Sequence, residues 1–223
     1  MKVLFASTLL FATIFVVSCS KHSTGPNPGS GTSSLFPLTY GSSWIYMDSA
    51  FSDSAVSAAY LDTMTVTKNI WQDPSLGTVY LELNDPYGWF DGSYISVDPS
   101  NDAIYEADSP YFSPYTFFAV AQSDGQLIGT GVDNTNPACP FYSNQYGWVT
   151  PVTVGNWSCF ENLELTTDCN NNPQEEIISY VAEGVGVVRI EHYLPDSTTG
   201  PLYEDYSQTL QSAIIAKEGK GLG

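Results

Sequence analysis

The chain has 223 residues, 24 of them acidic and 6 basic, which gives a formal net charge of −18. Such an acidic surface is a poor match for nucleic acid or anionic headgroups, because binding phosphates requires lysines and arginines that displace counterions. Charge of this size mostly serves solubility. The roughly 190 residues after the N-terminal segment are ample for one domain and short for two.

The first element expected along the chain is an export signal over residues 1–18. Lys2 is followed by an uncharged, largely apolar run from Val3 to Val17, and a basic residue before such a run is typical of a signal peptide. A permanent transmembrane anchor fits less well, because spanning a bilayer takes about 20 apolar residues and no positive flank follows this run at once.

The run ends in the sequence Val16-Val17-Ser18-Cys19, which resembles the lipobox of bacterial lipoproteins. The resemblance implies cleavage before Cys19 and acylation of its thiol. Two or three acyl chains anchor a protein stably, since each buried CH₂ contributes about 0.8 kcal/mol. Ser20 stands where an aspartate would, by resemblance to enterobacterial sorting, retain a lipoprotein at the inner membrane. We therefore expect a lipid-anchored protein of the outer membrane, and leave open whether it faces the periplasm or the cell surface.

Residues 19–34 are expected to form the lipidated cysteine and a flexible tether. Residues 20–34 contain no hydrophobic side chain, so nothing there can be buried to offset the entropy lost on ordering. A coil of this length has a root-mean-square reach of roughly 20 Å.

Residues 35–223 are predicted to form one all-β domain. Short runs of alternating apolar and polar residues are separated by turn sequences such as Asp85-Pro86-Tyr87-Gly88 and Asn170-Asn171-Asn172-Pro173, a pattern typical of antiparallel strands. No helical stripe of 12 residues interrupts them, so parallel crossovers are not expected. The architecture is a strongly curved sheet, forming an open or closed barrel, or a β-sandwich. The expected strands lie around residues 44–46, 56–66, 79–83, 95–97, 117–121, 126–132, 149–154, 157–165, 177–182, 187–194 and 206–215.

Two motifs resemble a loose, functionally uncharacterised group of exported bacterial lipoproteins. Residues 36–46 read F-P-L-T-Y-G-S-S-W-I-Y and are similar to the group's opening F-P-L-x-x-G-x-x-W-x-Y, and residues 180–188 read Y-V-A-E-G-V-G-V-V, similar to its late Y-x-A-x-G-V-G-x-V hairpin. Residues 155–162, G-N-W-S-C-F-E-N, fit a middle motif of lower specificity. The resemblance implies a lipoprotein with an all-β fold and carries over no active site.

Three cysteines remain once Cys19 carries lipid, and an oxidising compartment allows one disulfide. Alternation groups Cys159 with Trp157, Leu163 and Leu165, which predicts a buried strand thiol. Cys139 and Cys169 lie in turn-like stretches rich in Asn and Pro, so we favour a Cys139–Cys169 disulfide. The alternative, Cys159–Cys169, would close a shorter loop.

No constellation of catalytic or zinc-binding residues is recognisable. The two histidines are His22, in the tether, and His192, in an ordinary strand context, whereas hydrolytic triads need a histidine beside a nucleophile. Zinc sites lack ligands, and no Gly-rich phosphate loop is present. Two oxygen-rich loops, at 98–108 and 168–175, could in principle hold calcium, but both lack the glycine at the sixth position of an EF-hand loop and are better explained as Asx-rich turns. We expect no catalytic residue, no bound metal and no cofactor.

The resulting functional hypothesis is a non-enzymatic envelope lipoprotein, a binding or structural module tethered to the outer membrane by its N-terminal lipid, with no nucleic-acid partner and with protein partners unassigned. One alternative is a carrier of a lipid or other apolar ligand in a curved sheet. A second is a carbohydrate-binding or carbohydrate-degrading accessory protein, which predicts a row of exposed aromatic side chains. Six aromatic residues are candidates for that row, although core packing is the favoured explanation: Tyr105, Tyr111, Phe112, Tyr115, Phe117 and Phe118.

Overall fold

A computed structural model describes residues 35–52, 55–72, 79–86, 88–90, 93–98, 102–107, 115–133, 135–195 and 201–216. The expected signal peptide, Cys19 and the tether lie outside the described residues. Within them the chain forms these strands: β1 (Ser43–Ser52), β2 (Ala55–Gln72), β3 (Val79–Asn84), β4 (Tyr94–Asp98), β5 (Ala103–Ala107), β6 (Tyr115–Ala119), β7 (Gln126–Asp133), β8 (Phe141–Gly147), β9 (Val152–Val154), β10 (Trp157–Thr167), β11 (Pro173–Ala182), β12 (Gly186–Pro195) and β13 (Leu202–Ile214). No helix in these segments is long and apolar enough to cross a membrane.

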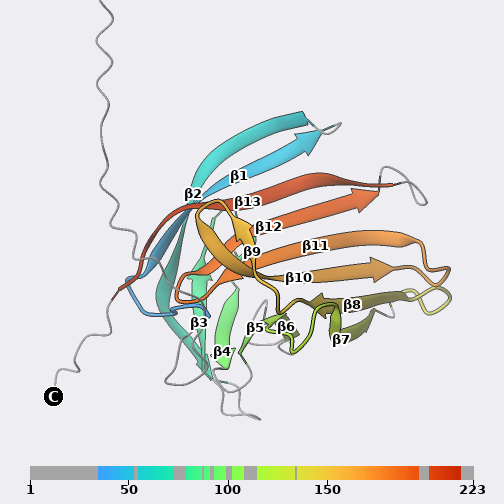
Figure 1. The fold of residues 1–223 in the computed structure, drawn as a ribbon, viewed down its shortest axis with the longest axis horizontal. Coiled ribbons are helices and arrows are strands. Elements are labelled where there is room, and N and C mark those ends of the chain that lie inside the picture. Colours follow the sequence, from blue (N-terminus) through green and yellow to red (C-terminus); the bar gives the residue numbers. More distant parts are fainter. Residues whose placement is uncertain are drawn as a thin grey trace, which may run out of the picture. The chain divides into compact units, whose positions relative to one another are not determined.

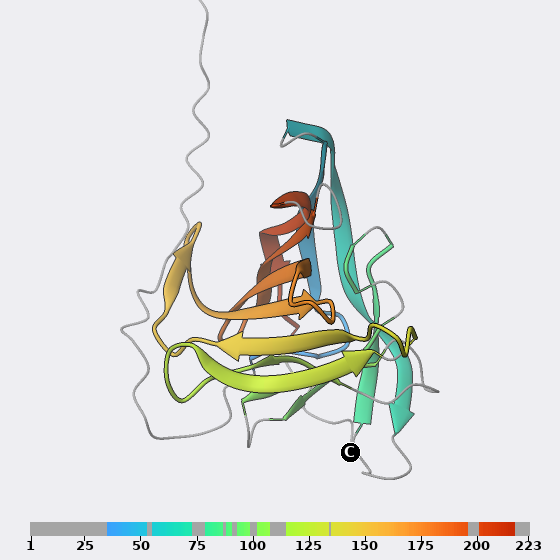
Figure 2. The ribbon, with the colours of Figure 1, turned by 90° about the vertical axis from the view of Figure 1, so that its right-hand side faces the viewer.

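All the strands belong to one antiparallel arrangement with the order β6-β5-β4-β3-β2-β1-β13-β12-β11-β10-β8-β7, and β9 pairs with β10. The sheet curls strongly, so that its two end strands approach each other (Figures 1 and 2). The all-β prediction is confirmed, and of the architectures expected from the sequence the protein adopts the nearly closed barrel and not the sandwich. Strands β5 and β8 were not expected from the sequence.

The approach of the two sheet ends is stabilised by side-chain amides in place of a backbone ladder. Asn162 on β10 accepts a hydrogen bond from the Ala119 backbone N–H at 3.0 Å and donates one to the Ala119 carbonyl at 2.9 Å. Gln145 on β8 donates to the Phe117 carbonyl at 2.8 Å. An amide side chain thus takes the place of a neighbouring peptide unit along the edge of β6, which satisfies backbone groups that would otherwise be buried unpaired.

Residues that pair across neighbouring strands form a row, and all side chains of one row point to the same face of the sheet. The next row points to the opposite face, because successive side chains of a strand alternate. One row crosses five strands and is buried throughout, although only one member is aliphatic: Asn162, Ser179, Ile190, Gln208 and Asp48. The adjacent row is only partly buried: Glu161, Tyr180, Arg189, Thr209 and Met47. The inner face of the barrel is therefore polar along this row.

The inner row corrects the face assigned to β10 from the sequence. Cys159 is buried as expected, but Asn162 is the next buried position of the strand, so the buried face changes between them. Leu163 and Leu165 are half-buried and stand outside the core cluster. The grouping of Cys159 with these two leucines was wrong, because β10 changes its partner from β9 to β11 and β8 at this point.

The opening and late sequence motifs pack against each other in the core. The Trp44 indole donates a hydrogen bond to the Val185 carbonyl at 2.6 Å, and the Tyr46 hydroxyl donates to the Val187 carbonyl at 2.8 Å. Phe36 packs edge-on against Trp44 with ring centroids 5.0 Å apart. Gly186 has a φ of +98°, and a Cβ there would collide with the Phe36 ring. The two motifs therefore specify one structural contact.

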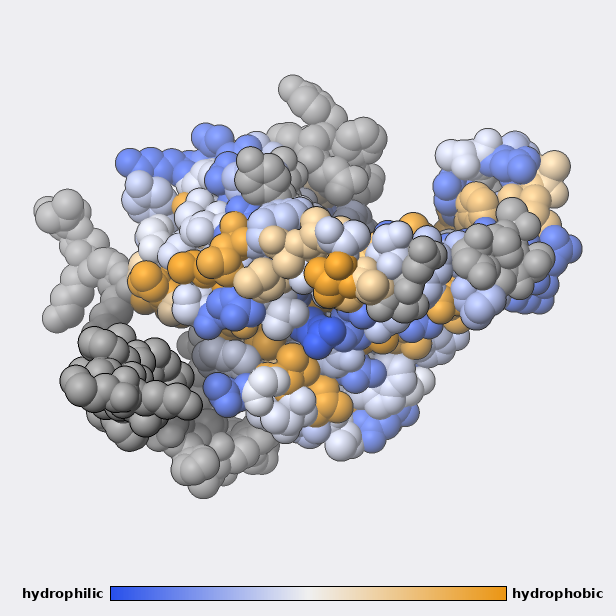
Figure 3. All heavy atoms as spheres, turned by 90° about the horizontal axis from the view of Figure 1, so that it is seen from above, coloured by the Kyte–Doolittle hydropathy of each residue, from blue (hydrophilic) through white to orange (hydrophobic). Residues whose placement is uncertain are grey.

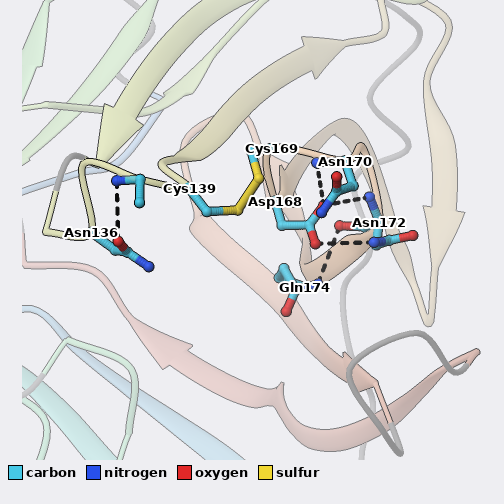
Figure 4. The surroundings of a disulfide bond; sticks show 8 residues. Asn136, Cys139, Asp168, Cys169, Asn170, Asn172 and Gln174 are labelled. Atoms are coloured by element: carbon cyan, nitrogen blue, oxygen red, sulfur yellow. Dashed lines mark hydrogen bonds between the residues drawn. A yellow bond between two sulfur atoms is a disulfide. The ribbon is translucent and has the colours of Figure 1, made fainter.

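A disulfide joins Cys139 to Cys169 with a Cα–Cα distance of 5.1 Å (Figure 4). This is the pairing that the turn composition favoured. Cys159 is a buried free thiol. Burial raises the pKa of the Cys159 thiol to about 11. Beside the bridge, the Asp168 carboxylate accepts hydrogen bonds from the backbone N–H groups of Asn170 and Asn172, both at 2.8 Å.

Candidate functional site

A short turn after β3 carries Trp89 toward the inside of the curved sheet. The Asp85 carbonyl accepts a hydrogen bond from the Gly88 N–H at 2.9 Å, and the Asp85 carboxylate accepts one from the Phe90 N–H at 3.0 Å. A Cβ on Gly88 would collide with Asp85 and with Gln208, so only glycine allows the turn to approach β13 so closely. The turn is thereby held with Trp89 half-buried.

Trp89 lines two cavities. The first, of about 360 Å³, is lined by Gly88, Trp89, His192 and Tyr206, and we call it the Trp89–His192 cavity. The second, of about 300 Å³, is called the Trp89–Glu164 cavity and is lined by Trp89, Tyr115, Phe117, Gln145, Asn162, Glu164, Ile177 and Ser179. Both volumes are at the lower end of the roughly 300–1,000 Å³ typical of small-ligand pockets. The two hollows together form the candidate site.

His192 is bonded on both sides of its ring. Nε2 lies 2.8 Å from Glu175 Oε1 and Nδ1 lies 2.7 Å from Asp205 Oδ1, and the ring packs edge-on against Trp89 at 5.7 Å. Burial lowers the pKa of His192, but the two carboxylates outweigh it and the net shift is upward. An imidazolium can donate from both nitrogens. Two carboxylates therefore hold His192 in place behind Trp89, and its raised pKa favours the imidazolium form.

Three aspartates lie deeper, on neighbouring strands and on the Trp89 turn. The Tyr206 hydroxyl donates to Asp48 at 2.9 Å, and Gln208 donates to Asp85 at 3.2 Å. Burial raises the pKa of Asp48 to about 6, despite the hydrogen bond from Tyr206, with a further upward contribution from Asp62. Burial likewise raises the pKa of Asp85 to about 7, and a hydrogen bond with Asp62 adds to the shift. Asp48 and Asp85 are both 0 % exposed, so they lie behind the cavities and not in their walls.

The amide side chains in the wall of the Trp89–Glu164 cavity are bonded within the protein. Asn162 donates its amide protons to the carbonyls of Ala119 and Glu161, and Gln145 donates to β6. The Ser143 hydroxyl donates to Glu164 and orients that carboxylate. The cavity is therefore lined by aromatic rings, one carboxylate, and the hydroxyls of Tyr115 and Ser179.

The described basic side chains are engaged elsewhere. Arg189 lies in the half-buried outer row, with its Nε 2.8 Å from Glu191 and its Nη2 3.6 Å from Glu204. Lys68 lies over the ring of Tyr40, 4.9 Å from the centroid. Within the described segments, neither cavity is lined by lysine or arginine.

The aromatic and oxygen-rich candidates from the sequence lie in the core, at the surface and in an Asx turn. Of the aromatic cluster, Tyr111 and Phe112 lie outside the described residues, Phe117 and Phe118 are buried, and Tyr115 is 45 % exposed. Asp168 forms an Asx turn, which lowers its pKa through hydrogen bonds from Asn172 and Asn170. In the described part of the chain no group of three or more His, Cys, Asp or Glu side chains is placed to hold a metal ion.

Sequence reasoning missed Trp89 and Glu164. Trp89 follows the recognised Asp85-Pro86-Tyr87-Gly88 turn, but nothing local indicates on which side of the sheet the turn lies. Glu164 alternates with Leu163 and Leu165, so the pattern predicts that it faces solvent. The one usable signal was the polar run of residues 142–145, Tyr-Ser-Asn-Gln, which supplies Ser143 and Gln145 from the unexpected strand β8.

Comparison with known proteins identifies likeness in fold only. No family model matches the chain, and no curated protein matches its sequence. A protein of Bacteroides fragilis, provisionally described as exported and of YmcC-like fold, is similar over 82% of this chain and all of its own length, with 10% identity and a TM-score of 0.48. A protein of Parabacteroides distasonis, provisionally described as a lipoprotein, is similar over 83% of this chain and all of its own, with 13% identity and a TM-score of 0.39.

Proposed function

We propose that the protein is an envelope lipoprotein, anchored to the outer membrane through Cys19, which binds a small polar ligand in the two cavities around Trp89 and does not transform it. The observation that carries this proposal is the composition of the cavity walls. They combine aromatic rings with a carboxylate and hydroxyls, as small-molecule sites do when a few polar groups orient a ligand against apolar surface.

The polar inner row argues against the alternative of an apolar cargo. A lipid tail placed in the Trp89–Glu164 cavity against Asn162 and Ser179 would cover polar groups and gain little from the hydrophobic effect, which scales with apolar area removed from water. On the face drawn in Figure 3, apolar side chains lie among hydrophilic ones.

The placement of the ionisable groups supports binding over catalysis. Both ring nitrogens of His192 are bonded to carboxylates, which leaves neither nitrogen to take a proton from a nucleophile. Asp48 and Asp85, the carboxyls whose pKa is raised to about 6 and about 7, are sealed behind the cavities, whereas a general acid or base must come within hydrogen-bond reach of its substrate.

Binding is tested by screening polar and apolar small molecules against the purified protein by ligand-observed NMR, in parallel with a Trp89→Ala variant. We expect polar hits whose signals are lost in the variant, while Trp71→Phe, which alters a tryptophan packed on Tyr80, retains them. An apolar molecule recovered in stoichiometric amount by extraction and mass spectrometry would refute the proposal in favour of a lipid carrier. Turnover of ester, peptide or glycoside substrates would refute its non-enzymatic part.

Anchoring is tested separately. Cells fed labelled palmitate should label the wild-type protein and leave Cys19→Ala unlabelled, with the wild-type label recovered in the outer-membrane fraction. Labelling of the Cys19→Ala protein would contradict lipidation at this residue. Recovery of the labelled wild type in the inner membrane would contradict the proposed location.

A further inference from the structure

The Trp89–Glu164 cavity brings three aromatic side chains and one carboxylate to a single hollow. Trp89 comes from the turn after β3, Tyr115 and Phe117 from β6, and Glu164 from β10. Phe117 is held in place by an edge-on contact with Phe90, at 5.0 Å between ring centroids. The carboxylate is oriented by Ser143. The site is thus built from separate elements, each fixed by its own packing or hydrogen bond.

We infer that this cavity binds the ammonium group of an organic amine, with Glu164 as its charge partner and Trp89, Tyr115 and Phe117 as its aromatic walls. The inference rests on the proposed function, because it names the ligand class of the same cavities. Aromatic rings attract cations through their quadrupoles, and the attraction is strongest where water is displaced. An adjacent carboxylate adds a charge-assisted hydrogen bond.

The hydrogen-bonding inventory of the wall favours an ammonium over a neutral polyol. An ammonium only donates hydrogen bonds, whereas a hydroxyl both donates and accepts. Asn162 has its amide protons bonded to backbone carbonyls, and Glu164 as a carboxylate only accepts. The hydroxyls of Tyr115 and Ser179 can donate as well as accept, so the carboxylate is the group that separates the two ligands: only the ammonium forms a charge-assisted hydrogen bond with it.

The electrostatic surroundings point the same way. Glu164 lines the cavity itself, and the charged groups closest to Trp89 on its other side are His192, Glu175 and Asp205, one imidazole with two carboxylates. The described lysine and arginine side chains are engaged elsewhere. An anionic ligand in the Trp89–Glu164 cavity would therefore meet Glu164 with no lysine, arginine or histidine among the lining residues, and like charges in a partly desolvated site repel strongly.

The test compares three ligands that share one ring and differ in charge: D-glucosamine, D-glucose and D-glucuronate, with n-butylammonium as an amine without hydroxyls. Binding is measured by titration calorimetry and tryptophan fluorescence at slightly acidic pH, where the amines are protonated. We expect both amines to bind, D-glucose to bind at least about tenfold more weakly than D-glucosamine, and D-glucuronate not to bind. Tenfold corresponds to about 1.4 kcal/mol.

The matched variants are Glu164→Gln, which removes the charge and keeps the shape, and Glu183→Gln, the same change in the exposed turn between β11 and β12. Amine affinity should fall about tenfold in the first and stay unchanged in the second, with circular dichroism verifying that both fold. Equal affinity for D-glucosamine and D-glucose, or amine binding unaltered by Glu164→Gln, would overturn the ammonium site while leaving the proposed binding function standing. Failure of every ligand in this set and in the NMR screen would overturn both.

Discussion

The buried carboxyl of Asp48 gives a prediction about stability and pH that can be worked out from its surroundings. Burial raises its pKa from 3.8 to about 6 in the folded protein. A carboxyl that binds its proton more tightly when folded makes the native state most stable at low pH, and that stability is lost as the pH rises from about 4 to about 6. One pKa unit corresponds to about 1.4 kcal/mol, so ionised Asp48 costs about 3 kcal/mol at neutral pH.

Asp48→Asn removes the ionisation and keeps an oxygen for the hydrogen bond from Tyr206. In urea unfolding at about pH 4.5, 6 and 8, wild-type stability should fall with pH, and the variant should lose about 2 kcal/mol less over the same range, because about 1 kcal/mol of the effect already lies below pH 4.5. The control is Asp133→Asn, which changes an exposed carboxylate hydrogen-bonded by Thr135 and should leave the slope unchanged. A variant whose pH profile parallels the wild type, or a wild type that becomes more stable toward pH 8, would refute the reasoning.

Three further predictions concern the framework around the site. Cys139→Ser should lower the free energy of unfolding by about 3–4 kcal/mol, since the bridge closes a loop with a sequence separation of 30; an unchanged urea midpoint would count against this. Asn162→Ala should cost about 3 kcal/mol and speed hydrogen exchange at Ala119, whose N–H and carbonyl lose their partner; normal protection there would contradict the amide closure. Gly186→Ala should cost more than about 3 kcal/mol through a positive φ and a clash with Phe36, whereas Gly155→Ala, with a positive φ in open space, should cost about 1–2 kcal/mol; equal thermal shifts would refute the role of the clash.

His192, like Asp48, makes the folded protein less stable as the pH rises. The carboxylates Glu175 and Asp205 raise the pKa of His192 above 6.5. An imidazolium held in this way stabilises the fold fully below its unfolded pKa of about 6.5, and the stabilisation is lost as the pH rises through the higher folded value. His192→Gln should therefore reduce stability most at acidic pH. If it weakened the protein equally at all pH values, the proposed charged state would be wrong.

The sequence predicts the fold class because most strands have a clear period of two and strong turn signals between them. β11, β12 and β13 lie within a few residues of the expected runs. β5 and β8 were not predicted because their composition is unusual for strands. β5 buries Glu106, which accepts a hydrogen bond from Ser93 at 2.6 Å. β8 contains the polar run that closes the barrel. Tertiary pairing overrides local propensity in both cases.

The candidate site could not be predicted for a related physical reason. Alternation identifies two faces of a strand, and the apolar face is normally assigned to the interior. In β10 the assignment fails, because Asn162 and Glu164 face the inside while Leu163 and Leu165 do not join the core. The residues that line the two cavities also come from β6, β8, β10, β11, β12 and β13 and from the Trp89 turn, and only the curvature of the sheet brings them together.

The polar inner face is also what connects the fold to the proposed binding activity. Burying Asp48, Gln208 and Asn162 costs free energy that an apolar row of similar size would not, so stability alone does not account for these residues. Two of them have a structural role. Asn162 bonds the backbone of β6 where no neighbouring strand does so, and Gln208 donates to the Asp85 carboxylate, which holds the Trp89 turn. Replacing the row with leucine would remove both the support of the Trp89 turn and the Asn162 and Ser179 side chains that line the cavity with Glu164. If such a variant unfolds at a higher denaturant concentration, it should also have lost ligand binding. A variant that is more stable and still binds the ligand would show that the row serves neither purpose.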